Sequence, residues 1–79
     1  MELKIYTTPT CIWSKKLKDW LKKKRIVFQE FDLIENEDAR EEIMLRSGQL
    51  ATPVIEIDHK IIVGFQEKML EELIKKGKS

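Results

Sequence analysis

One residue, Cys11, combines a reactive side chain with a setting that favours its reactive form. It is the only cysteine among 79 residues, so an intramolecular disulfide framework and a multi-cysteine zinc site within one chain are excluded. A lone cysteine is more often inert core filler than a reagent. Here it follows a Thr-Pro-Thr loop and precedes a helical pattern, with Thr10 as the expected N-cap. We therefore expect the sulfur in the first turn of a helix, facing unpaired backbone N–H groups.

Three neighbours of Cys11 are expected to favour the thiolate. Ser14 follows by three residues and can donate its hydroxyl to the sulfur. Lys15 and Lys16 come about one helical turn later and add positive potential. Because the thiolate, and not the thiol, is the nucleophile, the sequence predicts a reactive Cys11 whose pKa is tuned by Lys15 and Lys16.

Length and composition narrow the class of protein. The 79 residues are 42% hydrophobic and 37% charged, which predicts one folded domain over residues 1–79. No run of about 18 apolar residues is present to span a membrane, and the first residues lack the pattern of a signal peptide. The cytoplasm is the expected compartment, without a membrane partner.

The net charge of +1 conceals two opposite blocks. Residues 15–25 carry seven basic side chains against Asp19 alone, and residues 30–42 carry seven acidic ones. Both blocks are interpreted as solvated helix faces. A basic helix also suits nucleic acid, but Trp13 and Trp20 fall on the apolar stripe rather than among the lysines. No nucleic-acid partner is therefore expected.

Hydrophobic spacing predicts seven elements around this site. Alternating or β-branched runs predict strands, and apolar residues three and four apart predict helices. In chain order these are a strand at 1–6, a helix whose apolar side carries Trp13, Leu17, Trp20 and Leu21, a strand at 26–31, a helix from about Asn36 to Gly48, strands at 54–57 and 60–63, and a helix at about 66–76.

The middle helix has recognisable ends and an apolar side. Asn36 or a neighbour is expected to cap its start, where acidic residues suit the macrodipole. Gly48 is expected to end it. Ala39, Ile43 and Met44 are expected to face the core.

The order of the elements predicts an α/β fold. Two strands joined by a helix must be parallel with a right-handed crossover, whereas the strands separated by Asp58 and His59 form an antiparallel hairpin. A four-stranded mixed sheet with helices on both faces buries all the apolar stripes economically.

The motifs together resemble those of the glutaredoxins and related redoxins. Residues 6–16, with Cys-Ile-Trp-Ser, are similar to the active-site segment of that family, whose usual form is Cys-x-x-Cys and sometimes Cys-x-x-Ser. Ala51-Thr52-Pro53-Val54 is similar to its Thr-Pro segment, Ser47-Gly48-Gln49 matches before it, and Val63-Gly64-Phe65 matches after the hairpin. The resemblance covers nearly the whole chain in the right order and implies a thioredoxin-like fold of the form βαβαββα.

The resemblance also implies roles for individual residues. Pro53 would be cis and lie beside Cys11, so that the backbone of Thr52 pairs with an extended peptide or with glutathione. Trp13 is either a core residue by its spacing or an exposed platform beside the sulfur. The full set implied to bind substrate is Thr10, Ile12, Trp13, Thr52, Pro53, Gly64, Phe65 and Gln66.

Two departures favour one branch of the family. Phe65 stands where glutathione-dependent members often have a second glycine, and no lysine precedes Cys11 in the Thr8-Pro9-Thr10 stretch. The Gly-Phe pair resembles the small redoxins that serve ribonucleotide reductase and are recharged by thioredoxin reductase, and the two departures together argue against glutathione binding. The electron donor is expected to be such a reductase or glutathione, with glutathione as a co-substrate and no tightly bound cofactor or metal.

The expected function is reduction of protein disulfides or glutathione mixed disulfides by Cys11, in a monomer. Ser14 occupies the resolving position and cannot attack a mixed disulfide, so the chain is either a natural monothiol redoxin or a variant of a dithiol one. Two alternatives stay open. One is an iron–sulfur carrier in which two chains and two glutathiones share a cluster, which the bulk of Trp13 disfavours. The other is a redox-inactive adaptor that holds a peptide beside Pro53.

Overall fold

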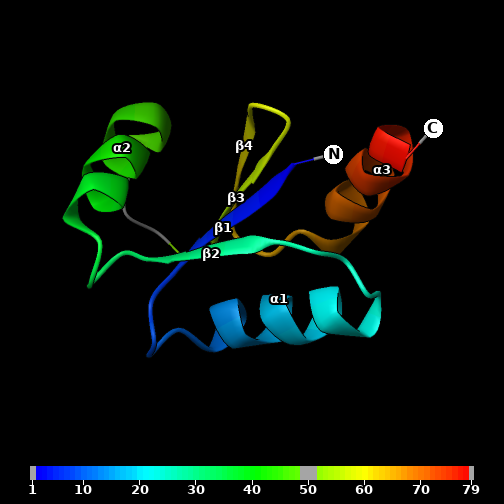
Figure 1. Ribbon diagram of the computed structural model, residues 1–79, viewed down its shortest axis with the longest axis horizontal. Helices are drawn as coiled ribbons and strands as arrows, with labels where there is room; N and C mark the ends of the chain where they lie inside the picture. Colours follow the sequence, from blue (N-terminus) through cyan, green and yellow to red (C-terminus); the bar gives the residue numbers. More distant parts are fainter. Residues whose placement is uncertain (1, 49–51, 79) are drawn as a thin grey trace.

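Three helices cover the two faces of a central sheet in the computed structural model, which describes residues 2–48 and 52–78 (Figure 1). The elements are β1 (Leu3–Thr7), α1 (Ile12–Lys23), β2 (Gln29–Asp32), α2 (Glu37–Ser47), β3 (Val54–Ile57), β4 (Lys60–Val63) and α3 (Glu67–Lys78). The strands lie in the order β2-β1-β3-β4. β1 pairs with β2 in parallel and with β3 antiparallel, and β3 pairs antiparallel with β4. The predicted mixed sheet and element order are confirmed.

Two apolar layers place the helices. On one face, Leu17 and Leu21 of α1 and Leu70 and Ile74 of α3 pack against the sheet around Ile5. On the other face, α2 packs against a smaller layer. Its members are Tyr6, Leu33, Ala39, Ile43 and Val54. Because α1 and α3 share a face, the start of α1 and the segment that leads into α3 lie on the same side of the molecule.

Local signals fix the ends of α2 and the hairpin. The Asn36 side chain accepts a hydrogen bond from the Ala39 N–H, and Gly48 ends the helix with a φ of 76°, as predicted. Asp58 and His59 have φ values of 45° and 74°, which is the double positive φ of the tight hairpin turn that matches strand twist. The Gly64 N–H donates to the Pro53 carbonyl at 2.7 Å, which holds the end of β4 beside the start of β3.

One strand boundary and one burial prediction are wrong. The second strand begins at Gln29 and not at residue 26, because the Ile26 N–H donates back to the Leu21 carbonyl at 3.0 Å and ties that segment to the end of α1. Val27 is 90% exposed. Met44 is 43% exposed, because α2 packs through Ala39 and Ile43, four residues apart on one stripe. The last helix begins at Glu67, within one residue of its predicted start.

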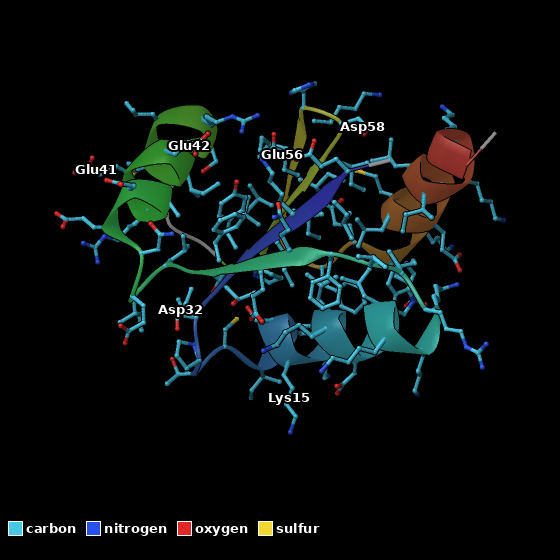
Figure 2. All side chains as sticks on the ribbon, viewed as in Figure 1. Lys15, Asp32, Glu41, Glu42, Glu56 and Asp58 are labelled. Atoms are coloured by element: carbon cyan, nitrogen blue, oxygen red, sulfur yellow. The ribbon has the colours of Figure 1, made fainter. Side chains whose placement is uncertain are left out.

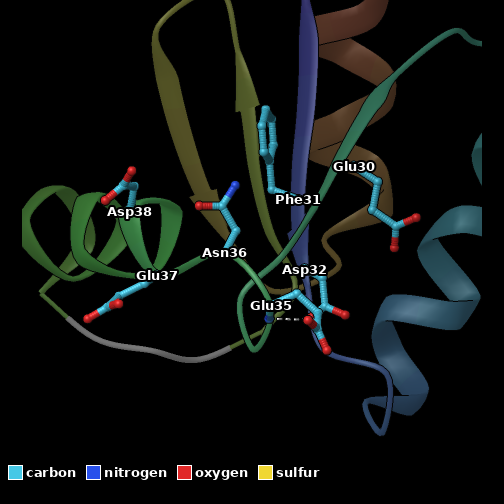
Figure 3. A pocket seen from close by; sticks show the side chains of 7 residues that line it. All are labelled: Glu30, Phe31, Asp32, Glu35, Asn36, Glu37 and Asp38. Atoms are coloured by element: carbon cyan, nitrogen blue, oxygen red, sulfur yellow. Dashed lines mark hydrogen bonds between the residues drawn. The ribbon is translucent and has the colours of Figure 1, made fainter.

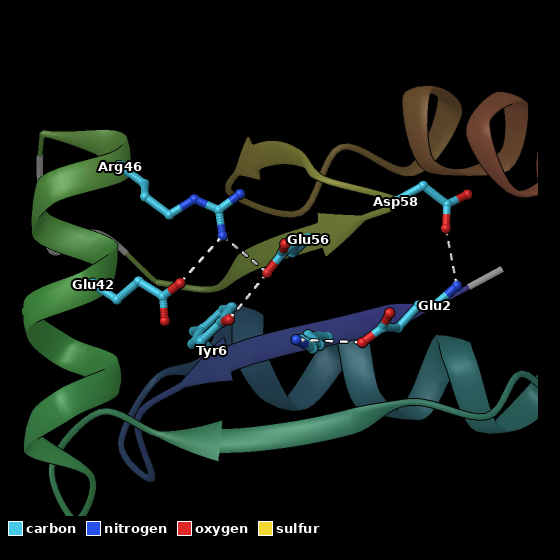
Figure 4. A network of polar contacts seen from close by, with 7 residues as sticks. Glu2, Tyr6, Glu42, Arg46, Glu56 and Asp58 are labelled. Carbon is cyan, nitrogen blue, oxygen red and sulfur yellow. Dashed lines mark hydrogen bonds and ion pairs between the residues drawn. The ribbon is translucent and has the colours of Figure 1, made fainter.

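A polar network holds α2 to the sheet (Figure 4). The Tyr6 hydroxyl donates to Oε1 of Glu56 at 3.2 Å, and Nη1 of Arg46 lies 3.1 Å from the same oxygen and 3.5 Å from Glu42. Burial, followed by the charge of Glu56, raises the pKa of Tyr6 to about 12. The phenol therefore stays protonated and remains a donor at neutral pH.

Candidate functional site

Cys11 stands at the N-cap position of α1 and not inside its first turn. Its backbone is extended, with φ −87° and ψ 115°, and the helix begins at Ile12. Thr10 was predicted as the cap, and this is wrong. The Cys11 N–H donates to the Thr8 carbonyl at 3.2 Å, and the Cys11 carbonyl accepts the first helical bond from Lys15. The loop turns one residue later than expected, so a sulfur occupies the place that a capping oxygen usually fills.

The sulfur lies beside a residue 41 positions away in the chain. The Cys11 thiol donates to the Thr52 carbonyl with a distance of 3.5 Å between sulfur and oxygen. The Thr52–Pro53 peptide bond is cis, as the family resemblance implied. The hydroxyls of Thr8 and Thr52 lie 3.4 Å apart. These contacts join the loop before α1 to the segment before β3.

The environment of the sulfur favours the thiolate. Burial raises the pKa of Cys11, but hydrogen bonds outweigh it and the pKa lies below its ordinary value. The stabilising groups are the side chains of Thr52 and Ser14 and the backbone N–H groups of Ser14 and Trp13, although the Cys11 side chain makes no capping hydrogen bond of ordinary geometry with the helix start. The backbone donors are the unpaired groups of a helix start, which stabilise an anion there.

Ser14 is the buried member of the site. It is 1% exposed, and within residues 2–48 and 52–78 its hydroxyl has no hydrogen-bond partner of ordinary geometry. The same hydroxyl lies close enough to the sulfur to lower the pKa of Cys11. The two observations agree because a neutral thiol is a poor hydrogen-bond acceptor for the Ser14 hydroxyl, whereas the charged thiolate is a good one.

The tuning of the Cys11 pKa by Lys15 and Lys16 stays a prediction. The leading causes of the lowered pKa of Cys11 are burial and hydrogen bonds, and the charges of Lys15 and Lys16 are not among them. The Lys16 ammonium instead lies over the Trp13 ring, 4.5 Å from its centroid. Lys15 points from α1 into solvent, away from the sheet (Figure 2).

An uncharged groove of about 300 Å³ is lined in part by Thr52, whose carbonyl contacts the sulfur. It is lined by six of the residues predicted to bind substrate, namely Trp13, Thr52, Pro53, Gly64, Phe65 and Gln66. Trp13 is 56% exposed, so of its two predicted roles the structure favours the platform. Phe65 meets Trp20 edge-on at 5.8 Å between ring centroids. Ile12 is 70% exposed beside Trp13 in the chain, but neither it nor the exposed Thr10 lines this groove.

A second groove, of about 280 Å³, runs from the sulfur along α1. Its lining residues are Thr8, Pro9, Cys11, Ser14, Lys15, Lys18, Asp19 and Lys22. The sequence-based prediction missed Thr8, Lys18 and Lys22. For Lys18 and Lys22 the signal was the recurrence of lysines three and four residues apart, which places them on one face of the helix with Cys11.

A larger hollow of about 550 Å³, whose lining does not include Cys11, lies at the start of α2 (Figure 3). It is lined by acidic side chains such as Glu35 and Glu37. Its polar groups serve the local turn, because Asp32 accepts hydrogen bonds from the backbone N–H groups of Ile34 and Glu35. In the described part of the chain, no group of three or more His, Cys, Asp or Glu side chains is arranged to hold a metal ion.

The fold and the helix-terminal thiol define a thioredoxin-like redoxin with a single cysteine. Residues 3–62 match the sequence model described as Glutaredoxin, and the chain belongs to the glutaredoxin family. Gln49 and Ala51 of the predicted motifs lie outside the described residues.

Known proteins of this kind are similar along most of the chain. An uncharacterised glutaredoxin-like 8.6 kDa protein in the rubredoxin operon of Clostridium pasteurianum is 46% identical over 74 residues, which cover 94% of this chain and 99% of that protein. Glutaredoxin 3 of Escherichia coli K12 is 39% identical over 62 residues, which cover 78% of this chain and 75% of that protein. The glutaredoxin-like NrdH-redoxin of Escherichia coli shares the fold with a TM-score of 0.84 at 22% identity, over 92% of this chain and 95% of that one.

These findings assign a thiol–disulfide redox function at the level of family and fold. No helix within the described residues is long and apolar enough to cross a membrane.

Proposed function

We propose that this chain reduces mixed disulfides by a monothiol route in which Cys11 is the nucleophile. The observation that carries the proposal is the position of the sulfur, at the N-cap of α1 and 3.5 Å from the Thr52 carbonyl. A thiolate held there lies next to a backbone that can pair with an extended substrate peptide. The lowered pKa of Cys11, set by burial and the hydrogen bonds that outweigh it, supplies the reactive species.

The reaction proceeds in two balanced exchanges. The Cys11 thiolate attacks one sulfur of the substrate disulfide, a new sulfur–sulfur bond forms at Cys11, and the other substrate sulfur leaves as a thiolate. An external thiolate then attacks the mixed disulfide, takes the substrate sulfur into a new disulfide and releases the Cys11 thiolate. Ser14 attacks neither bond, because its alcohol is not ionised near neutral pH.

The external thiol in this proposal is glutathione. Cys11 is the only cysteine in the sequence, so no intramolecular disulfide forms for a thioredoxin-reductase-like enzyme to reduce. Protein disulfides and glutathione mixed disulfides are the proposed substrates, and the uncharged groove beside Thr52 and Pro53 receives the substrate chain. The proposed setting is a monomer in the cytoplasm, where glutathione keeps thiols reduced. The cluster-carrier and adaptor hypotheses stay untested predictions.

A coupled assay tests the proposal. A glutathionylated peptide is mixed with glutathione, glutathione reductase and NADPH, and turnover is followed by the loss of NADPH. We expect turnover by the wild type and none by Cys11→Ser. Mass spectrometry of the protein quenched during turnover should show one glutathione on Cys11. If the wild-type rate equals that of Cys11→Ser, or if no adduct forms, the proposed function is wrong.

A further inference from the structure

The face of α1 that begins at Cys11 is basic over its whole length. Lys15, Lys18 and Lys22 recur at spacings of three and four residues, which aligns them on one side of a helix. All three line the groove that also contains the Cys11 sulfur, and Asp19 is the single acidic residue of that lining. The groove therefore carries three positive charges against one negative charge, beginning beside the reactive atom.

Two of these charges are available to a partner. Lys18 is engaged, because its Nζ lies 3.0 Å from Oε2 of Glu30. Lys15 and Lys22 are exposed, and no ion pair joins either of them to a residue in the described part of the chain. The acidic Glu41 and Glu42 project from α2, on the opposite face of the sheet from Lys15 (Figure 2). These two acidic residues therefore do not neutralise the groove beside Cys11.

The two grooves beside Cys11 differ in chemistry. The groove toward Thr52 and Pro53 has no charged side chain in its lining, whereas the groove along α1 is basic. A disulfide substrate has chain on both sides of its sulfurs, so both grooves can be occupied together. The helical rise of about 1.5 Å per residue puts Lys22 roughly 16 Å from Cys11 along the axis, a span that about five residues of extended peptide cover.

We propose that the basic groove selects substrate proteins whose disulfide is flanked by acidic residues, within about five positions of the attacked cysteine. This inference rests on the proposed function and adds the substrate class. Lys15 and Lys22 are positioning residues in it, since they touch the acidic segment and not the reacting sulfurs. Complementary charge acts mainly on the rate of encounter, so the preference appears in the second-order rate of mixed-disulfide formation.

The test uses peptides activated at one cysteine as a thiopyridyl mixed disulfide, whose leaving group is followed by absorbance. Three peptides of equal length carry Glu, Gln or Lys at the flanking positions. With the wild-type chain at low ionic strength we expect the Glu peptide to react about tenfold faster than the Lys peptide. At about 0.5 M salt, where the Debye length is only a few ångströms, we expect the ratio to fall to about twofold.

Two matched double variants distinguish the effect of the lysines in this groove from the effect of the net charge of the chain. Lys15→Gln/Lys22→Gln should bring the reaction rates of the three peptides to within about twofold of one another. Lys60→Gln/Lys75→Gln removes the same charge from the hairpin and α3, where both lysines are exposed, and should keep the wild-type preference. Circular dichroism checks that both variants are folded.

Each failure has its own signature. No reaction with the Gln peptide overturns the proposed function itself. If the wild-type chain reacts with the three peptides at equal rates, this inference alone is overturned. The same holds if both double variants lose the preference for the Glu peptide equally. If Lys15→Gln/Lys22→Gln slows only the attack of glutathione on the mixed disulfide, the groove serves glutathione and the inference is wrong. Binding of a single-stranded DNA oligomer that the same variant abolishes, without a peptide preference, would assign the face to nucleic acid instead.

Discussion

Replacing Ser14 by alanine is expected to change stability in opposite directions at low and high pH. The side chain is 1% exposed, and its hydroxyl lacks a partner of ordinary geometry in the described residues. While Cys11 is a neutral thiol this hydroxyl is an unsatisfied buried group, which costs about 1–3 kcal/mol. Ser14→Ala removes that cost. We therefore expect the variant to be more stable than the wild type by about 1 kcal/mol at a pH where the thiol is protonated.

Ionisation of Cys11 reverses the effect. The hydroxyl then gains a charged acceptor, and hydrogen bonds to charged groups contribute about 1.5–3 kcal/mol. Cys11 is only partly buried, so solvent screening brings the contribution below that range. Removing the hydroxyl should then destabilise the folded state by about 1 kcal/mol. The full swing of about 2 kcal/mol corresponds to roughly 10 °C in Tm for a domain of this size.

The sign of the pH dependence follows from the direction of the pKa shift. Burial raises the pKa of Cys11, but the hydrogen bonds outweigh it, so the folded pKa lies below the ordinary value. Such a group adds stability that is fully present above the unfolded pKa of about 8.5 and is lost as the pH falls through the folded pKa. Ser14→Ala should raise the pKa of Cys11 in the folded state. The difference between the folded and unfolded pKa then becomes smaller, and ionisation of Cys11 adds less stability to the variant than to the wild type.

The measurement is urea unfolding followed by tryptophan fluorescence, under reducing conditions, between about pH 5 and about pH 10 so as to bracket the thiol titration. The rate of alkylation by iodoacetamide gives the folded pKa in parallel. Ser47→Ala is the matched control, because the Ser47 hydroxyl donates to the Ile43 carbonyl at 2.6 Å on α2. The change in stability caused by Ser47→Ala should have the same sign at every pH. In a Cys11→Ala background the pH dependence of Ser14→Ala should vanish. Equal effects of Ser14→Ala at about pH 6 and about pH 9.5 would refute the reasoning.

Two other substitutions test the mechanism and the support of the fold. Ser14→Cys supplies a second thiol three residues after Cys11, so we expect an intramolecular disulfide under mild oxidation, seen as the loss of two free thiols, and turnover with thioredoxin reductase that the wild type lacks. Arg46→Met leaves the buried carboxylate of Glu56 with the Tyr6 hydroxyl alone. We expect a loss of about 1–2 kcal/mol in urea unfolding, less than for a fully buried pair, because Arg46 is partly exposed.

Periodicity in the sequence predicted the helices and strands well wherever the apolar residues of an element all pack into one layer of the core. The stripe of α2 through Ala39 and Ile43 and the hairpin around Asp58 and His59 are confirmed, since each depends on neighbours close in the chain. Ile26 misled the prediction. It is buried, but by the turn that closes α1, and a buried β-branched residue gives the same signal in a strand and in such a turn.

The functional site was only partly within reach of the sequence. The type and helical setting of Cys11 pointed to a thiolate, yet the choice of cap depended on one backbone turn, which the Thr8 carbonyl closes. The contact with Thr52 spans 41 positions, and no local pattern encodes it. It was expected only from the resemblance to glutaredoxins. The basic groove was missed because lysines on a helix are usually solvated, and their shared lining with Cys11 is a property of the folded surface.

With a single thiol, the step of the reaction at which substrates are discriminated changes. In a dithiol redoxin the second cysteine releases a bound substrate from within the chain, so a wrong mixed disulfide is short-lived. Ser14 removes that escape, and in the proposed mechanism every mixed disulfide on Cys11 waits for an external thiol. Discrimination must then occur when the bond forms. Charge along α1 acts at that stage, because electrostatic complementarity affects encounter more than residence. A basic face beside Cys11 therefore has more influence on specificity here than it has in a protein that resolves its own mixed disulfide.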